Sequence, residues 1–115
     1  MGLVKLEGHE DNLVTPQYST ARGPVLRSDT MELTKGFYEM GKGADTHAHP
    51  EEQILYVLSG RGRVTLGEET YDVGPGDVSF HPPDVPHSIV ALEDLTVLSV
   101  KHLVNPIYQA TGRLR

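Results

Sequence analysis

Five short segments rich in β-branched and aromatic residues follow one another along this 115-residue chain. Turn signals such as Ser59-Gly60 and Gly74-Pro75-Gly76 lie between them. Such segments are typical of β-strands, and no stretch shows sustained helical periodicity flanked by capping residues. The pattern predicts an all-β fold, a small barrel or jelly roll, with an ordinary β-sandwich as the alternative. The segments are residues 54–58, 63–66, 70–73, 78–81 and 95–100.

Two histidines one residue apart, His47 and His49, indicate a metal site. Alternate side chains of an extended strand share a face, so both imidazoles can point at one ion. Gln53 can join them once Pro50 has bent the path of the chain, and His87 is the candidate for a fourth ligand. The alternative is that these histidines lie on the surface of a β-sandwich.

The spacing around the histidines resembles the first motif of the cupin superfamily. Gly41, His47, His49, position 53 and Gly60 stand at the family's intervals, with Gln53 where most members carry Glu. The resemblance implies that His47, His49 and Gln53 hold a metal ion together with a histidine from a second motif.

The second cupin motif runs from Gly76 through Pro82 to His87. Two positions depart from it, because Asp84 stands in place of its usual Gly and Ala91 in place of its terminal Asn. The connection between the motifs has the short length of compact single-domain cupins. The resemblance implies a cupin double-stranded β-helix, the jelly-roll barrel of RmlC-like proteins, with His87 as the fourth ligand.

The chain is predicted to form a single cupin domain, residues 1–115, because its length is usual for one domain. The barrel is expected over about residues 30–104. An N-terminal arm, residues 1–22, and a C-terminal tail, residues 105–115, carry no motif. In similar cupins such an arm often adds an edge strand or swaps onto a partner subunit. The resemblance also leads us to expect a homodimer.

Composition limits the partners and the cellular setting. The net charge is -6 and the basic residues are scattered, so the chain has no electrostatic footprint for nucleic acid. No apolar run approaches the ~20 residues of a membrane span, and the first residues lack the pattern of a signal peptide. We therefore expect a cytoplasmic protein that binds neither nucleic acid nor membrane.

The candidate ligands limit the metal without naming it. The chain has no Cys, and nitrogen and oxygen donors suit one divalent ion of Mn, Fe, Co, Ni or Zn. Gln53 could bind the ion directly, bind through a water molecule, or hydrogen-bond a ligating histidine. Glu51 and Glu52 are predicted to face solvent, Glu52 because strand alternation places it opposite Gln53.

The neutral ligand set also bears on the substrate and on the catalytic groups. It leaves the charge of a divalent ion uncompensated, so the site is expected to attract a small anionic molecule and to act as a Lewis acid. His81 is the candidate catalytic residue, as a general acid or base near neutral pH, and a place on the outer face is the alternative. Weaker candidates of the same kind are Tyr38, Tyr56, Tyr71, Ser99, Lys101 and His102.

Three functions remain open on the sequence. The first is a metal-dependent enzyme, an isomerase or lyase without net redox change, acting on a small anionic, oxygen-rich substrate such as a sugar acid. The ligand set resembles the small cupins that convert unsaturated uronates in pectin and alginate breakdown, and also small manganese cupins with hydroxynitrile lyase activity. Ser99 departs from the acidic residue that the uronate enzymes carry on the last barrel strand. The alternatives are an Fe(II)-dependent dioxygenase of a chelating substrate and a non-catalytic barrel that binds a small ligand.

Overall fold

The computed structural model describes residues 2–8 and 12–104. Over these ranges the regular structure consists of β-strands apart from one short 3-10 turn, η1 (Leu6–Gly8), so the all-β prediction is confirmed. The strands are β1 (Asn12–Leu13), β2 (Arg22–Gly23), β3 (Val25–Arg27), β4 (Met31–Tyr38), β5 (Gly43–His47), β6 (Gln53–Ser59), β7 (Gly62–Leu66), β8 (Glu69–Val73), β9 (Val78–His81), β10 (His87–Ala91) and β11 (Leu95–His102).

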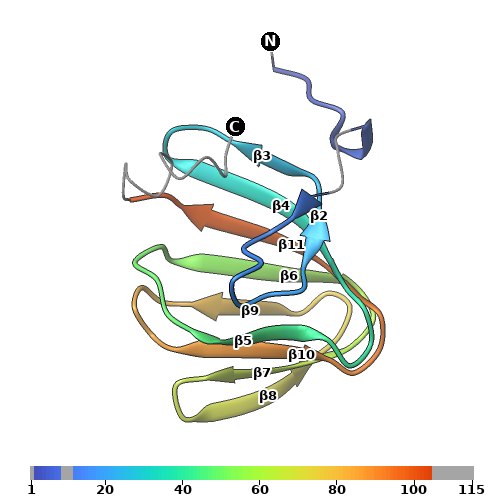
Figure 1. The fold of residues 1–115 in the computed structure, drawn as a ribbon, viewed down its shortest axis with the longest axis vertical. Coiled ribbons are helices and arrows are strands. Elements are labelled where there is room, and N and C mark those ends of the chain that lie inside the picture. The colour runs from blue at the N-terminus through green and yellow to red at the C-terminus, as the bar shows by residue number, and fades with distance from the viewer. Residues whose placement is uncertain (1, 9–11, 105–115) are drawn as a thin grey trace.

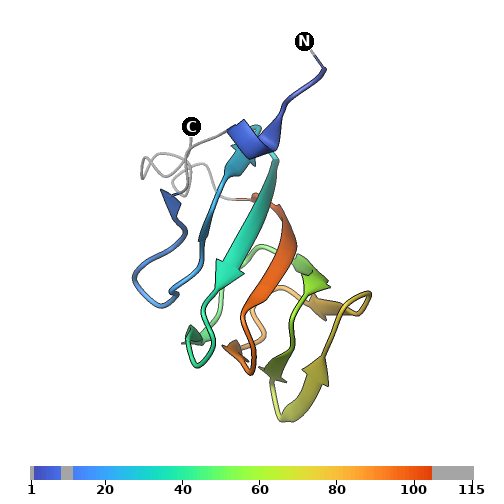
Figure 2. The ribbon, with the colours of Figure 1, turned by 90° about the vertical axis from the view of Figure 1, so that its right-hand side faces the viewer.

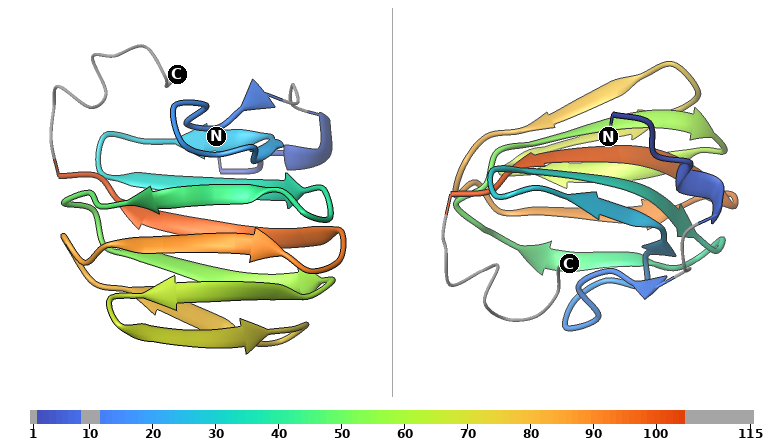
Figure 3. Two further views of the ribbon diagram at one scale, coloured as in Figure 1. Left: turned by 60° about the horizontal axis from the view of Figure 1, so that its bottom comes forward. Right: turned by 90° about the horizontal axis from the view of Figure 1, so that it is seen from above.

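Two antiparallel sheets face each other and form the walls of a jelly-roll barrel (Figure 1). Sheet A has seven strands, in the order β1-β2-β4-β11-β6-β9, with β3 paired to β4. Sheet B has four strands, in the order β5-β10-β7-β8. Figure 2 shows β4 and β11 side by side in sheet A, and Figure 3 shows the strands of the two sheets as separate layers. Chain neighbours such as β4 and β5 lie in opposite sheets, as the predicted cupin fold requires.

The interior of the barrel changes from apolar to polar along its strands. On β11 the inward-facing Val97 is apolar, whereas Ser99 and Lys101 are polar, and all three are buried. The antiparallel β6 matches this change, because Val57 pairs with Val97 and Gln53 pairs with Lys101. One end of the barrel is therefore a hydrophobic core and the other is a polar cavity. The core consists of Ala21, Tyr38, Ala44, Leu55, Val57, Val64, Val73, Ile89, Ala91, Leu95 and Val97.

All five predicted segments lie in strands, namely β6, β7, β8, β9 and β11, whereas β4 had no prediction. The strand expected to carry both His47 and His49 ends at His47, so His49 lies in the loop that follows it. The strand β4 alternates buried and more exposed positions, but its buried side carries Glu32 and Thr34. Its apolar Met31 and Phe37 face outward instead. The hydrophobic pattern was a poor guide here because β4 lines the polar half of the barrel.

Two turns hold the motifs in place. Asp84, which replaces the glycine of the second motif, adopts a φ of 63°, a conformation that aspartate tolerates better than most residues. Its backbone N–H donates to the carbonyl of His49 at 2.9 Å, which ties the second motif to the first. At Gly60 a Cβ atom would lie 1.9 Å from the carbonyl oxygen of Asp94, so this turn accepts only glycine.

Part of the predicted N-terminal arm packs on the barrel of its own chain. Strand β1 pairs with β2, and β2 pairs with β4 at the edge of sheet A. The arm thus adds an edge strand, which is one of the two expected outcomes. The predicted C-terminal tail, residues 105–115, lies outside the described residues.

The outer face of sheet A exposes apolar side chains on neighbouring strands. Ile54 pairs with Phe80 and Tyr56 pairs with Val78 across β6 and β9, and all four are exposed. A homodimer, which stays a prediction, has an apolar surface available here. No helix within residues 2–8 and 12–104 is long and apolar enough to cross a membrane.

Candidate metal centre

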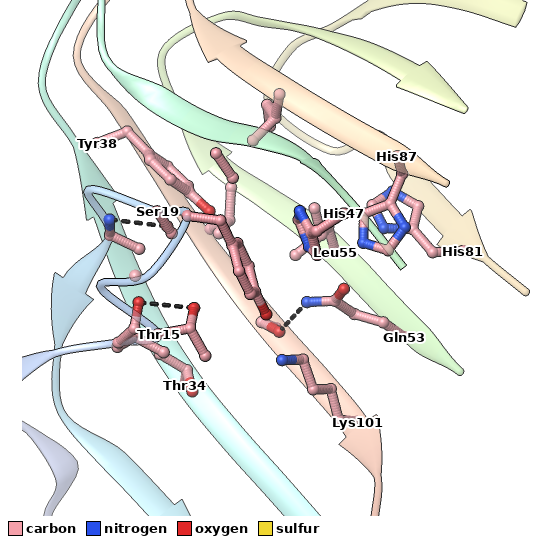
Figure 4. A pocket seen from close by; sticks show the side chains of 18 of the residues that line it. Thr15, Ser19, Thr34, Tyr38, His47, Gln53, Leu55, His81, His87 and Lys101 are labelled. Atoms are coloured by element: carbon pink, nitrogen blue, oxygen red, sulfur yellow. Dashed lines mark hydrogen bonds between the residues drawn. The ribbon is translucent and has the colours of Figure 1, made fainter. Parts of the chain in front are cut away.

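Three histidines converge at the polar end of the barrel. His47 ends β5 and His87 begins β10, and the two residues pair across these strands. His49 follows in the loop that leads to Gln53, the first residue of β6. One ring nitrogen from each histidine lies within 4.8 Å of the other two, so one ion could contact all three. Gln53 lines the same cavity, beside His47 and His87 (Figure 4).

Backbone carbonyls orient the three imidazoles. The Nδ1 atoms of His47, His49 and His87 lie 2.6, 2.9 and 2.9 Å from the carbonyl oxygens of Asp45, Glu51 and Val85. A carbonyl oxygen only accepts, so each Nδ1 carries the proton and each Nε2 keeps its lone pair for a ligand.

The unsatisfied nitrogens test whether a metal ion fits. The Nε2 atoms of His49 and His87 are buried and have no hydrogen-bond partner. Such buried groups are uncommon in native proteins and are accounted for by an ion or a water molecule. Buried lone pairs that face one another are the arrangement that a divalent cation satisfies, so the residues fit the implied metal.

Gln53 is held by a hydrogen bond that leaves its oxygen available. Its Nε2 donates to Ser99 Oγ at 2.8 Å, across β6 and β11. The amide oxygen is then the atom that can serve as a ligand, directly or through a water molecule. Direct ligation by Gln53 stays a prediction, and Ser99 contributes by orienting the amide.

The histidines are neutral at physiological pH. Burial lowers the pKa of His47 and of His49 to about 4, and it also lowers the pKa of His87. The positive charge of Lys101 adds to the lowering of the pKa of each of these three residues. Because protons do not compete for the lone pairs at pH 7, the site is ready to bind a cation.

These pKa shifts predict that the metal-free protein loses stability in mild acid. An unfolded histidine has a pKa near 6.5, and the native values for His47 and His49 are about 4. Below pH 6.5 the unfolded chain therefore binds more protons than the native protein, so the free energy of unfolding falls as the pH drops towards 4. We expect the apparent Tm of the metal-free protein to fall by about 10 °C from pH 7 to pH 5.

Differential scanning fluorimetry of chelator-treated protein checks this expectation. Zinc-saturated protein is the control, because occupied lone pairs resist protonation and move the loss to lower pH. Equal Tm values at pH 7 and pH 5 for the metal-free protein would contradict the assignment of buried neutral histidines.

His81 lies inside the barrel rather than on its outer face. It is only 1% exposed, and its ring centroid lies 4.3 Å from that of His87. Its Nε2 is 2.8 Å from Ser79 Oγ, which in turn is 2.7 Å from the hydroxyl of Tyr71. Burial, and then the neighbouring His87, lowers the pKa of His81 to about 3, so the ring is neutral at pH 7. Its catalytic role stays a prediction.

The prediction that Glu51 faces solvent is wrong. Glu51 is 1% exposed, and neither carboxylate oxygen has a hydrogen-bond partner. Its Oε1 lies 3.9 Å from Nδ1 of His49. Strand alternation did not apply because Glu51 lies in the bend before β6, whereas Glu52 is exposed as expected. The site therefore has a buried carboxylate nearby, which partly offsets the charge of an ion.

Charged residues of β4 and β11 complete the polar end. Lys101 is 5% exposed and pairs in register with Glu32, which is 2% exposed and forms an ion pair with Arg27. Lys101 and Glu32 both line the cavity that contains His47 (Figure 4 labels the lysine). The formal charges of Lys101, Arg27, Glu32 and Glu51 cancel, so a bound divalent ion leaves this end of the barrel positive.

The weaker candidates separate into two groups. Tyr38, Ser99 and Lys101 line the cavity, and Tyr71 is linked through Ser79 to His81, which also lines it. Tyr56 and His102 are exposed outside the barrel. No motif pointed to Glu32 or Tyr18, because acidic and aromatic residues in an unpredicted strand or an arm carry no recognisable spacing. Tyr18 stacks on His47, with ring centroids 3.7 Å apart.

A family model described as a cupin domain matches residues 36–101, which include both motifs and every candidate ligand. The chain belongs to the cupin family. A crystal structure of an RmlC-like cupin from Shewanella frigidimarina superposes with a TM-score of 0.81 at 19% identity, covering 94% of this chain and 96% of that one. KdgF from Halomonas superposes with a TM-score of 0.74 at 24% identity, covering 87% and 91%. Both confirm the cupin fold.

Curated relatives match this chain over part of their length. The uncharacterized protein MJ1618 of Methanocaldococcus jannaschii is 38% identical over 66 residues, 56% of this chain and 53% of that protein. The chain thus spans about half the length of this relative. Oxalate decarboxylase OxdC of Bacillus subtilis is 40% identical over 44% of this chain and 14% of its own. Dimethylsulfoniopropionate lyase DddQ of Ruegeria pomeroyi is 31% identical over 57% and 33%.

Proposed function

We propose that this cupin is a metal-dependent enzyme of the isomerase or lyase type, acting without net redox change on a small anionic, oxygen-rich substrate such as a sugar acid. The observation that carries the proposal is the position of Lys101, a buried cation in the same cavity as His47, Gln53 and His87. A positive side chain beside a cation site disfavours a second cation and favours an anion that contacts both. The neutral ligand set also favours an anion, because it leaves the charge of a divalent ion uncompensated.

The side chains of the cavity have two different roles, metal binding and substrate binding. His47, His49 and His87 would hold the ion together with Gln53, and a bound divalent ion supplies Lewis-acid polarisation of substrate oxygens. Lys101 is positioned to bind a carboxylate, and Ser99, which accepts from Gln53, keeps its own hydroxyl proton to donate.

The neutral ring of His81 is the candidate for holding a proton near the substrate. It lines the same cavity, and Ser79 is hydrogen-bonded to its Nε2. Ser79 fixes the orientation of the ring, because the hydroxyl is itself bonded to Tyr71. The Nδ1 atom of His81 has no partner and is the atom left for this role.

Two relatives support the substrate class. OxdC and DddQ are named for oxalate and dimethylsulfoniopropionate, and both compounds carry a carboxylate on a small carbon skeleton. Decarboxylase and lyase are both names for bond-breaking without transfer to a second substrate. Their similarity covers 44% and 57% of this chain and a third or less of each relative, so it supports a class of chemistry rather than a particular substrate.

A panel of small carboxylates and sugar acids, including unsaturated uronates, tests the proposal. Metal-loaded protein is expected to convert at least one of them without consuming oxygen, as followed by ultraviolet absorbance, proton NMR and an oxygen electrode. The His49→Ala variant is expected to lose the activity, and the exposed His102→Ala variant is expected to keep it. No rate above background for any compound would count against the enzyme. Substrate-dependent oxygen uptake with Fe(II) would favour a dioxygenase, and a thermal shift without product would favour a binding protein.

A further inference from the structure

A segment of the N-terminal arm, residues 14–20, crosses the side of the barrel between the edges of the two sheets. We call this segment the strap. It leaves β1 at the edge of sheet A and then runs beside β5, the edge strand of sheet B. The N–H of Asp45 donates to the carbonyl of Tyr18 at 2.7 Å, and the N–H of Thr20 donates to the carbonyl of Gly43 at 2.9 Å. The strap therefore extends sheet B at the strand that carries His47.

Tyr18 covers the metal centre from this strap. Its ring stacks on the imidazole of His47 with an interplanar angle of 20° and a centroid distance of 3.7 Å. Tyr18 also lines the inner cavity together with Gln53, His87 and Lys101. Because His47 is only partly buried, the aromatic ring is what shields this ligand on one face.

The cavity beneath Tyr18 is small. Its volume is about 40 Å³, which gives room for about three water molecules. A sugar acid has several times that number of non-hydrogen atoms, so it cannot enter while the ring stays in place. Strand β11 pairs with β4 and with β6 over most of its length, whereas the strap meets β5 at one isolated bridge, Ser19 with Ala44. The strap is therefore the part of the wall that yields most easily.

The strap is hydrogen-bonded at its ends and also at its turn, where the carbonyl of Thr15 accepts from the N–H groups of Tyr18 and Ser19 at 3.2 and 3.1 Å. Val14 N–H donates to the carbonyl of Ala21, and Ser19 Oγ accepts from the N–H of Ala21, at 2.9 and 3.0 Å. Between these ties, Thr15 has a φ of 48°, a conformation that β-branched residues rarely adopt. Pro16 and Gln17 are exposed. The turn that precedes Tyr18 thus combines backbone strain at Thr15 with two exposed residues.

We propose that Tyr18 is the movable roof of the metal centre, a residue that positions His47 and limits the size of the ligand that can reach the ion. Its role as a size filter rests on the proposed function, whereas its covering of His47 does not. Small carboxylates reach the ion with the roof in place, and larger ones require the strap to lift.

The rate at which a chelator removes cobalt tests whether Tyr18 covers the metal centre, and it needs no substrate. In protein loaded with Co²⁺, EDTA is expected to remove the metal about 3- to 10-fold faster from Tyr18→Ala than from wild type, since a stacked aromatic pair contributes an energy of this order. Tyr18→Phe keeps the ring and is expected to match wild type. Tyr56→Ala, which removes an exposed tyrosine on the outer face of sheet A, is the matched control. The visible spectrum of Co²⁺ should also shift in Tyr18→Ala alone, because the orientation of His47 changes.

A second measurement needs no metal. Carbethoxylation of His47 by diethyl pyrocarbonate, resolved from His49 by fragment-ion mass spectrometry, is expected to be faster in metal-free Tyr18→Ala than in wild type and in Tyr56→Ala. Equal rates of labelling and equal rates of metal removal in wild type and Tyr18→Ala would refute the proposed covering of His47 by Tyr18. If the wild type binds no metal but His47 is still labelled faster in Tyr18→Ala, the proposed function is refuted and the covering of His47 by Tyr18 is supported.

Discussion

Replacement of His49 by alanine is expected to abolish stoichiometric metal binding while leaving the barrel folded. His49 lies in the loop between β5 and β6, outside the strand pairs, so its loss breaks no strand-to-strand hydrogen bond. Loss of a residue that only supports a ligand typically lowers metal affinity by about 10- to 100-fold, and loss of a ligand itself should exceed this. We therefore expect the affinity to fall by more than roughly 100-fold.

Metal content measured by inductively coupled plasma mass spectrometry, on protein purified without a histidine tag, checks this result. His102→Ala is the matched control, because His102 is an exposed histidine outside the cluster. Circular dichroism establishes that the variant is folded. As a second readout, added Zn²⁺ should raise the Tm of the wild type but not of His49→Ala, since only a bound ligand stabilises the native state. Equal metal content in wild type and His49→Ala would refute the assignment of the site.

Replacement of Lys101 by methionine separates anion binding from metal binding. Methionine keeps much of the length of the side chain and removes its charge. A hydrogen bond to a charged group contributes about 1.5–3 kcal/mol, so we expect the affinity of the metal-loaded protein for a small carboxylate such as oxalate to fall by about 10- to 100-fold. Metal affinity should rise or stay level, because the positive charge of Lys101 acts on all three candidate histidine ligands.

Isothermal titration calorimetry with Zn²⁺ and then with oxalate measures both affinities in one protein. Lys35→Met is the control, since Lys35 lies on the same sheet but pairs with the exposed Glu7 at the surface. Lys101→Arg is expected to recover part of the anion affinity. A Lys101→Met protein that binds oxalate as well as wild type would remove the main support for an anionic substrate.

The sequence predicted the metal centre better than its surroundings. His47 and His87 come together through antiparallel pairing, and His49 joins them from the loop after β5, two residues beyond His47. The spacing of the three residues is visible in the chain. The apolar segments that became β6, β7, β8, β9 and β11 were visible for the same reason. β4 was not visible, because its buried face carries Glu32 and Thr34 and thereby inverts the usual hydrophobic pattern.

By itself, the sequence determined the all-β class, the cupin motifs and the histidines, since each of these depends on residue type and interval along one strand or turn. Only the tertiary structure decided which distant residues share the polar end of the barrel. Lys101 reaches the histidines because β11 pairs with β6 in a register that sets it against Gln53. Glu51 is buried by a bend, and Tyr18 meets His47 because the strap runs beside β5. Register, bends and the docking of an arm depend on packing across the whole barrel, and no local pattern records them.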